Sequence, residues 1–192
     1  MGMPQEEIKL PARETYTYTD YALLPEGAPY QLIGGKLIMT PAPTTFHQIV
    51  SGRLESALRA WVTARDLGLV IDSPVDVYLE EAETYQPDII FIARERLDIV
   101  EEARVNGAPD LVVEILSPST AYYDLRKKAR TYASYGVKEY WVADPAEKSL
   151  ELYTNHEGSF ILEQRVEGEG QFKSLLLPGL AVEVREVFAS FR

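Results

Sequence analysis

The sequence predicts one α/β domain of 192 residues, in which helices flank both faces of a mixed β-sheet. Short apolar runs rich in Ile and Val, each bounded by turn residues, predict buried strands at 89–93, 111–116 and 139–143. Apolar stripes with a helical period predict a long helix at 44–67 and a second helix at about 121–135. The order helix, strands, helix, strand suits this fold class.

The N-terminal region is expected to add an arm and a hairpin to this domain. Residues 1–15 show no hydrophobic period and are predicted to form a flexible arm. A short helix is predicted before Pro25, which stops it. The runs YQLI and KLIM, at 30–39, flank Gly34-Gly35, which predicts a two-residue β-hairpin.

The first long helix is predicted to run from Thr44 to about Leu67. Thr45 and Gln48 have the spacing of a capping box at its start, and Gly68 is expected to end it. Its apolar stripe consists of Phe46, Val50, Leu54, Ala57, Leu58 and Trp61.

The C-terminal portion, 145–192, has the alternating pattern of a β-meander. We expect it to extend or cover the sheet and to close with a short helix at 184–191. No repeat and no glycine-rich phosphate loop is found, because Gly34-Gly35 lacks both the spacing and the following helix of such loops.

Carboxylates stand at two of the predicted buried strands. Asp88 and Asp110 each follow a proline at a strand start, and Glu114 lies in the middle of the apolar run 111–116. A carboxylate in an apolar strand is costly unless it is paired, hydrogen-bonded or bound to a metal. Asp110 and Glu114 share one face, and if the two strands are neighbours Asp88 can converge with Glu114. Such a group would suit Mg²⁺ or Mn²⁺, although Asp at a strand start also commonly satisfies loop amides.

The helix that follows carries a cation on its apolar side. Its stripe contains Ala121, Leu125, Ala129, Tyr132 and Tyr135. Lys128 falls within this stripe, whereas Lys127 falls on the polar side, so Lys128 is the cation expected to point at the sheet. It would either take part in the chemistry or pair with one of the acids.

His47 lies at the start of the first long helix, on the edge of its stripe. A single histidine at such a place is either a core or cap residue or a member of a site. The chain has only one other histidine, His156, in a predicted turn, and it has no cysteine. Hydrolases of the Ser/His or Cys/His type are therefore disfavoured.

These residues resemble those of a known family. The PD-(D/E)XK nuclease superfamily has a similar order of elements: Pro-Asp before a strand, a strand with an embedded Glu, then a helix and another strand. Over about residues 30–153 the chain more closely resembles the Uma-two family of this superfamily, whose members are restriction-endonuclease-like proteins. Four strings carry this resemblance: YQLIGGKLIMTPAPTTFHQIV, QPDIIFIARERL, GAPDLVVEILSPST and GVKEYWVADP.

The resemblance implies a restriction-endonuclease-like fold and a Mg²⁺- or Mn²⁺-dependent endonuclease that hydrolyses DNA. Asp88 and Glu114 would be metal ligands, and His47 and Asp110 would be auxiliary groups or, for Asp110, a further ligand. The superfamily's lysine stands two residues after the acid, where this chain has Leu116, so the catalytic lysine would be Lys128 on the next helix. The hairpin also departs from the family, because acidic residues are expected where Gln31, Gly34 and Lys36 stand.

The charge and composition of the chain limit the kinds of binding partner and the cellular location that can be expected. The net charge is −11, which argues against a protein that coats nucleic acid, but residues 119–138 carry a local excess of Lys and Arg that could guide a DNA backbone. No signal peptide or membrane-spanning run is seen, and the lack of cysteine fits a cytoplasmic protein. Homo-oligomerisation is left open. The alternative to an enzyme is a non-catalytic nuclease-like module for protein contacts or weak nucleic-acid binding.

Overall fold

The computed structural model describes residues 13–25, 27–40, 42–117 and 123–190. Most of the predicted arm at 1–15, the strand-breaking Pro41 and the first residue of the second helical stripe, Ala121, lie outside the described residues. Within the described ranges, no helix has the length and apolar character needed to cross a membrane.

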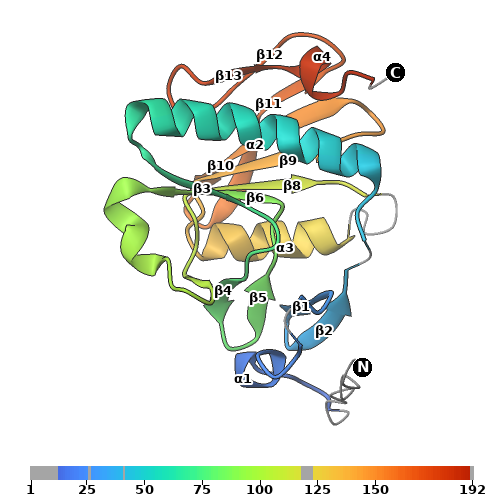
Figure 1. The fold of residues 1–192 in the computed structure, drawn as a ribbon, viewed down its shortest axis with the longest axis vertical. Helices are drawn as coiled ribbons and strands as arrows, with labels where there is room; N and C mark the ends of the chain where they lie inside the picture. The colour runs from blue at the N-terminus through green and yellow to red at the C-terminus, as the bar shows by residue number, and fades with distance from the viewer. Residues whose placement is uncertain (1–12, 26, 41, 118–122, 191–192) are drawn as a thin grey trace, which may run out of the picture.

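A mixed sheet of six strands forms the centre of the molecule, in the order β11-β10-β9-β8-β6-β3 (Figure 1). Strands β8 and β9 are parallel, and the other neighbours are antiparallel. The strands are β3 (Gly68–Asp72), β6 (Ile89–Ala93), β8 (Leu111–Ile115), β9 (Glu139–Asp144), β10 (Ser149–His156) and β11 (Ser159–Glu167). The mixed sheet predicted from the sequence is therefore present.

Helices lie on both faces of this sheet. Helix α2 (Thr45–Arg65) covers one face and α3 (Tyr123–Ser134) lies on the other (Figure 1). Along β8, Leu111 and Val113 pack in the core on the α2 side, whereas Val112 packs in the core that contains Tyr132 of α3. Because side chains alternate along a strand, Glu114 belongs to the α3 side. Helix α3 also forms the crossover that joins the parallel strands β8 and β9.

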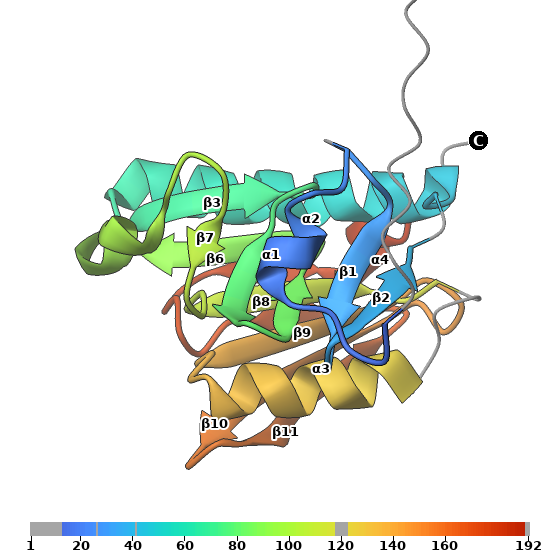
Figure 2. The same ribbon diagram turned by 90° about the horizontal axis from the view of Figure 1, so that it is seen from below.

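The predicted hairpin is present, but it belongs to a second sheet of five strands, in the order β2-β1-β5-β4-β7. Its strands are β1 (Tyr30–Ile33), β2 (Lys36–Met39), β4 (Val77–Glu80), β5 (Glu83–Tyr85) and β7 (Val105–Asn106). Tyr85 of this sheet shares a core with Ile90 of β6 and Tyr132 of α3. Seen from below, the second sheet and the short helix α1 (Tyr18–Tyr21) lie in front of the central sheet, between α2 and α3 (Figure 2). The second sheet and α3 thus share one face of the central sheet.

The C-terminal portion divides between two places. Strands β10 and β11 extend the central sheet, whereas β12 (Gln171–Lys173) and β13 (Ala181–Glu183) pair with each other. Helix α4 (Val184–Val187) follows directly, and its buried residues join the core on the α2 side. The expected closing helix is therefore shorter than 184–191.

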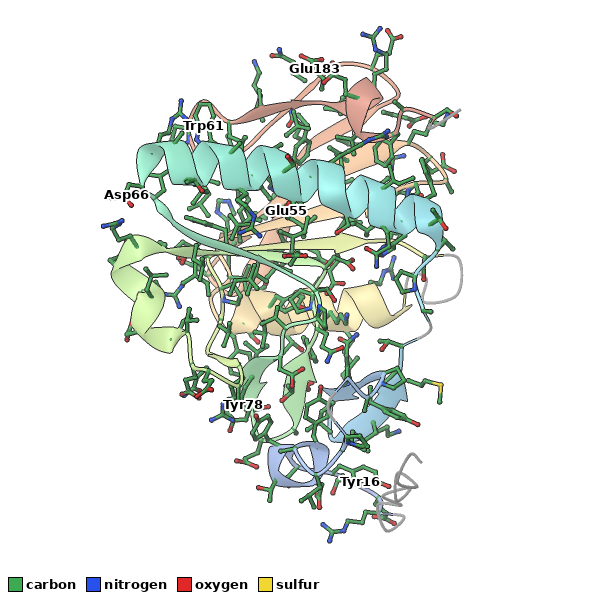
Figure 3. The ribbon with its side chains drawn as sticks, viewed as in Figure 1. Tyr16, Glu55, Trp61, Asp66, Tyr78 and Glu183 are labelled. Carbon is green, nitrogen blue, oxygen red and sulfur yellow. The ribbon has the colours of Figure 1, made fainter. Side chains whose placement is uncertain are left out.

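The two ends of α2 differ from the prediction by one or two residues. Thr44, rather than Thr45, is the N-terminal cap, and Asp66, labelled in Figure 3, takes the left-handed conformation after the last turn. Gly68 does not end the helix but begins β3, with a φ of 148°. A Cβ at Gly68 would collide with the carbonyl oxygen of Ile92, so the pairing of β3 with β6 requires glycine there.

Candidate active site

Asp88 and Glu114 face each other across two neighbouring strands of the central sheet. Strand β6 runs antiparallel to β8, and the pairing of Ile89 with Val113 fixes the register. One residue pair further along, Asp88 lies opposite Glu114, on the same face of the sheet. Oδ2 of Asp88 accepts a hydrogen bond from the N–H of Ile115 at 2.7 Å. The two acids converge because the strands that carry them are neighbours.

Glu114 is held by two side chains of α3. Lys128 Nζ lies 3.1 and 3.4 Å from the two carboxylate oxygens, and the Tyr132 hydroxyl donates to Oε1 at 2.9 Å. Lys128 and Tyr132 are one helical turn apart and project from the same side of α3. All three side chains are buried. Lys128 therefore points at the sheet, as the helical stripe predicted, and Tyr132, another member of that stripe, also bonds to Glu114.

The charges in this cluster are not balanced. Burial raises the pKa of the Glu114 carboxyl, the Lys128 ammonium lowers it and the Asp88 carboxylate raises it again, with a raised pKa as the net result. Burial and the Glu114 carboxylate also raise the pKa of Tyr132, so its hydroxyl remains a hydrogen-bond donor. Lys128 pairs with Glu114, whereas Asp88 lies beside His47, and a cation between the two carboxylates would be stabilised by both.

His47 joins the cluster from the first turn of α2. The side chain of Thr44 accepts a hydrogen bond from the His47 N–H at 3.2 Å, which fixes the start of the helix. His47 Nε2 lies 3.5 Å from Oδ1 of Asp88. Burial lowers the pKa of His47, but Asp88, the backbone of Ile115 and Glu114 raise it, and the net shift is upward. His47 thus lies beside Asp88, close to the sheet residues that carry the two acids.

Asp110 is not brought to this cluster. It shares a face with Glu114 but stands four residues earlier on the chain, about 13 Å away along a strand. Its Oδ2 accepts from the Ala93 N–H at 2.8 Å, and its Oδ1 pairs with Lys138 at 2.8 Å and Arg96 at 3.0 Å. We therefore assign Asp110 a structural role at the start of β8, in place of the ligand or auxiliary role expected from the sequence.

The second sheet also reaches the cluster, through a residue that the sequence did not single out. The Tyr85 ring packs edge-on against Tyr132 at 5.3 Å and lies 5.9 Å from Lys128 Nζ. The Tyr85 hydroxyl donates to Glu83 at 2.6 Å, and Glu83 also accepts from the N–H of Gly34 at 2.8 Å. The turn of the hairpin is thus tied to the wall of the site through Glu83, which binds Gly34, one of the three positions where acids were expected.

Residues 16–185 match the model of the Uma2 family, whose description is "Putative restriction endonuclease". The chain belongs to this family. A crystal structure described as "a putative nuclease belonging to DUF820", from Anabaena variabilis, is similar in fold, with a TM-score of 0.75. The two chains are 20% identical, and the match covers 90% of this chain and 97% of the other. No curated protein matches the chain. The resemblance to the Uma-two family and the predicted restriction-endonuclease-like fold are confirmed.

The cluster of this Uma-two protein fits the metal that the family implies. Asp88 and Glu114 bring carboxylate oxygens together from adjacent strands, and oxygen is what Mg²⁺ and Mn²⁺ prefer. Among the described residues, no group of three or more His, Cys, Asp or Glu side chains is placed to hold a metal. Mg²⁺ does not require such a group, because it usually binds one or two carboxylates and keeps several waters. The placement of Asp88 opposite Glu114 on adjacent strands is the observation that favours a cation here.

Proposed function

We propose that this protein is a Mg²⁺- or Mn²⁺-dependent endonuclease that hydrolyses phosphodiester bonds in DNA. The observation that carries the proposal is the Asp88–Glu114 pair on adjacent buried strands, with Lys128 Nζ 3.1 Å from Glu114. Membership of a family described as "Putative restriction endonuclease" supports nuclease chemistry. Phosphodiester hydrolysis needs a cation site and a positive charge near the reacting phosphate, and this cluster offers groups for both.

Asp88 and Glu114 would hold the metal. When bound, such an ion polarises a phosphate and lowers the pKa of a coordinated water. Hydrogen bonds from other residues of the protein hold both carboxylates in place. The Ile115 N–H fixes one oxygen of Asp88, and the Tyr132 hydroxyl fixes one oxygen of Glu114. His47 acts as a positioning residue, because its Nε2 faces the other oxygen of Asp88.

Lys128 would supply the charge that the reaction needs. Its ammonium is buried, so its field is screened less than that of a surface lysine. It would stabilise the additional negative charge on the phosphoryl oxygens in the transition state, or orient the attacking water. Its place on α3 compensates for Leu116, which stands where the superfamily usually has the lysine.

DNA would approach along the exposed side of α3. Arg126, Lys127 and Arg130 are exposed there, in a chain whose net charge is −11. Such a local basic face can contact a phosphate backbone although the whole protein is acidic. Binding of this kind weakens as salt rises.

The test is cleavage of supercoiled plasmid DNA, followed on agarose gels. We expect nicking that requires Mg²⁺ or Mn²⁺, stops with EDTA and weakens with salt. Glu114→Gln keeps the shape of the side chain and should reduce the rate at least about 100-fold. Glu186→Gln, at an exposed position on α4, is the matched control and should cleave like the wild type. Failure to cleave supercoiled, linear and single-stranded DNA with the metal bound would contradict the proposal.

A non-catalytic nuclease-like module is the second candidate. The observation that favours it is the ion pair itself, since Lys128 already neutralises Glu114 in the structure. A protein of this kind would keep the fold for protein contacts or weak nucleic-acid binding. It would show no specific binding of Mg²⁺ or Mn²⁺ at Asp88 and Glu114, which isothermal titration with the Glu114→Gln variant as reference would reveal.

A further inference from the structure

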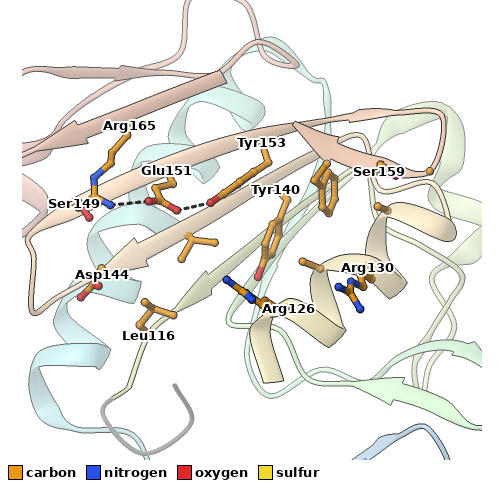
Figure 4. Close-up of a pocket in the computed structure, with 15 residues that line it drawn as sticks. Leu116, Arg126, Arg130, Tyr140, Asp144, Ser149, Glu151, Tyr153, Ser159 and Arg165 are labelled. Atoms are coloured by element: carbon orange, nitrogen blue, oxygen red, sulfur yellow. Dashed lines mark hydrogen bonds and ion pairs between the residues drawn. The ribbon is translucent and has the colours of Figure 1, made fainter. Parts of the chain in front are cut away.

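A cavity of about 650 Å³ lies between α3 and the strands β9, β10 and β11 (Figure 4). Tyr140 and Val142 of β9 line it, on the same sheet face as Glu114. Leu116, two residues after Glu114, also lines it. Asp88, Glu114 and Lys128 do not line the cavity, so it adjoins the candidate active site without being part of it. Its volume is in the range of small-ligand sites.

One polar group in the cavity wall lacks a partner. Tyr140 is 2% exposed, and its hydroxyl forms no hydrogen bond with any residue that the structure describes. Figure 4 shows the hydroxyl end of the ring directed at the space beside α3. Burial and then Glu114 are the main causes that raise the pKa of Tyr140, so this hydroxyl is also within electrostatic reach of the active site. Buried hydroxyls are nearly always hydrogen-bonded, and this one therefore points to a ligand group.

The wall of the cavity is aromatic. The rings of Tyr140 and Phe160 are stacked, with centroids 5.2 Å apart and planes 14° apart. Beside them, the Tyr153 hydroxyl donates to Glu151 at 2.5 Å, and Glu151 pairs with Arg165 at 2.8 Å. Glu151 and Arg165 thus neutralise each other at this end of the cavity. The aromatic surface beside them could contact a planar apolar group.

Cations stand on the opposite wall. Arg126 and Arg130 are four residues apart on α3, and both line the cavity. Arg130 is exposed and forms no ion pair with the part of the chain that the structure describes. A guanidinium is well suited to a phosphate, and aromatic side chains are well suited to a nucleobase. An aromatic wall, a hydroxyl without a partner and a cationic rim together match the chemistry of one nucleotide.

We propose that this cavity holds an unpaired nucleotide of the nucleic-acid substrate, next to the phosphate that is cut at Glu114. The proposal rests on the proposed function. The base would lie against the half-buried rings of Phe160 and Tyr153 and bond with the Tyr140 hydroxyl, and its phosphate would contact Arg130. Nucleotides enter such pockets most easily where they are already unpaired. The protein would then prefer strands that carry a bulged or single-stranded nucleotide over a fully paired duplex.

The experiment measures binding without cleavage. Two fluorescein-labelled DNA duplexes, identical except for one bulged thymidine, are titrated with the full chain in EDTA and followed by fluorescence anisotropy. We expect the wild type to bind the bulged probe about tenfold more tightly than the paired one. Ser159→Trp fills the cavity from an exposed lining position and should abolish this preference. Ser56→Trp, at an exposed position on α2, is the matched control and should keep it.

A second, more conservative variant keeps the proposal testable if Ser159→Trp does not fold. Tyr140→Phe keeps the ring and should reduce the preference about threefold through loss of one hydrogen bond. Equal affinity of the wild type for the two probes, or an unchanged preference in Ser159→Trp, would overturn the proposal. So would displacement of the bulged probe by dTMP at equal concentration, which would assign the cavity to a free nucleotide. Because EDTA prevents cleavage, a protein that shows the preference but never cuts DNA would refute only the proposed function.

Discussion

The ammonium of Lys128 lies 3.1 Å from Oε1 of Glu114, and the two side chains are 9% and 8% exposed. The two residues come from different elements, α3 and β8, and both are buried between the central sheet, α3 and Tyr85 of the second sheet. A lone buried ion pair adds little net stability, because desolvation offsets the attraction. We therefore expect the pair to serve the proposed site rather than the stability of the fold.

The first prediction compares two adjacent lysines. Lys128 is buried against Glu114, whereas Lys127 is exposed near the hairpin turn at Gly34. Lys128→Ala should reduce the rate of DNA nicking at least about 100-fold, and Lys127→Ala less than about threefold. Single-turnover nicking rates at saturating protein provide the measurement. Equal losses in the two variants would indicate general attraction of DNA rather than a role for Lys128 in the reaction.

The second prediction concerns the hydroxyl that fixes Glu114. Tyr132→Phe keeps the buried ring and removes the 2.9 Å hydrogen bond to Oε1. A hydrogen bond to a charged group contributes about 1.5–3 kcal/mol, so the free energy of unfolding in urea should fall by that amount. Tyr135→Phe, at a 38% exposed position directly after α3, loses only a surface contact with Glu80 and should change it by less than about 0.5 kcal/mol. A Tyr132→Phe variant as stable as the wild type would show that this hydrogen bond does not hold the carboxylate.

The third prediction tests the structural role of Asp110. Burial raises the pKa of this carboxyl, but the Ala93 N–H, Lys138 and Arg96 lower it more, and the net shift is downward. A lowered pKa contributes stability above the unfolded value of about 3.9, and that stability is lost as the pH falls through the folded-state pKa. The free energy of unfolding of Asp110→Asn should therefore be about 1.5–3 kcal/mol lower than that of the wild type at pH 7. This difference between the two proteins should disappear in acid.

Urea unfolding at a series of pH values between neutral and strongly acidic gives the measurement. Asp98→Asn, at an exposed position, is the control and should follow the wild type at every pH. A gap between Asp110→Asn and the wild type that is the same at all pH values would contradict the assignment of an ionised, structurally paired Asp110.

Strand alternation and helical periodicity predicted the main parts of the site. Alternation placed Asp88 and Glu114 on faces that meet once β6 and β8 are neighbours, and the stripe of α3 placed Lys128 toward the sheet. The same rule misplaced Asp110, because alternation fixes a face but not the distance along a strand. Tyr135 was assigned to the stripe but is 38% exposed, since the chain turns away at Gly136 with a φ of 91°.

Other features could not be predicted because they depend on contacts between distant segments. The pairing of β1 with β5 makes the hairpin part of a second sheet, and no local pattern indicates that pairing. Tyr85 and Tyr132 have the pattern of ordinary core residues, and only their hydroxyl partners, Glu83 and Glu114, distinguish them. The spacing of Tyr132, four residues after Lys128 on the same helix face, is the one signal that could have indicated its role.

The central claim, that Asp88 and Glu114 form a metal site, is tested most directly by thermal melts of the wild type and Glu114→Gln, each with and without Mg²⁺. We expect Mg²⁺ at about 100 times its Kd to stabilise the wild type by about 2.7 kcal/mol and to leave Glu114→Gln unchanged. Without metal, Glu114→Gln should equal the wild type or exceed it by about 1 kcal/mol, because burial disfavours the charged form of Glu114 and the neighbouring Asp88 adds repulsion. A loss of about 3–5 kcal/mol in metal-free Glu114→Gln, with no effect of Mg²⁺ on the wild type, would contradict the claim and make Glu114 a structural partner of Lys128.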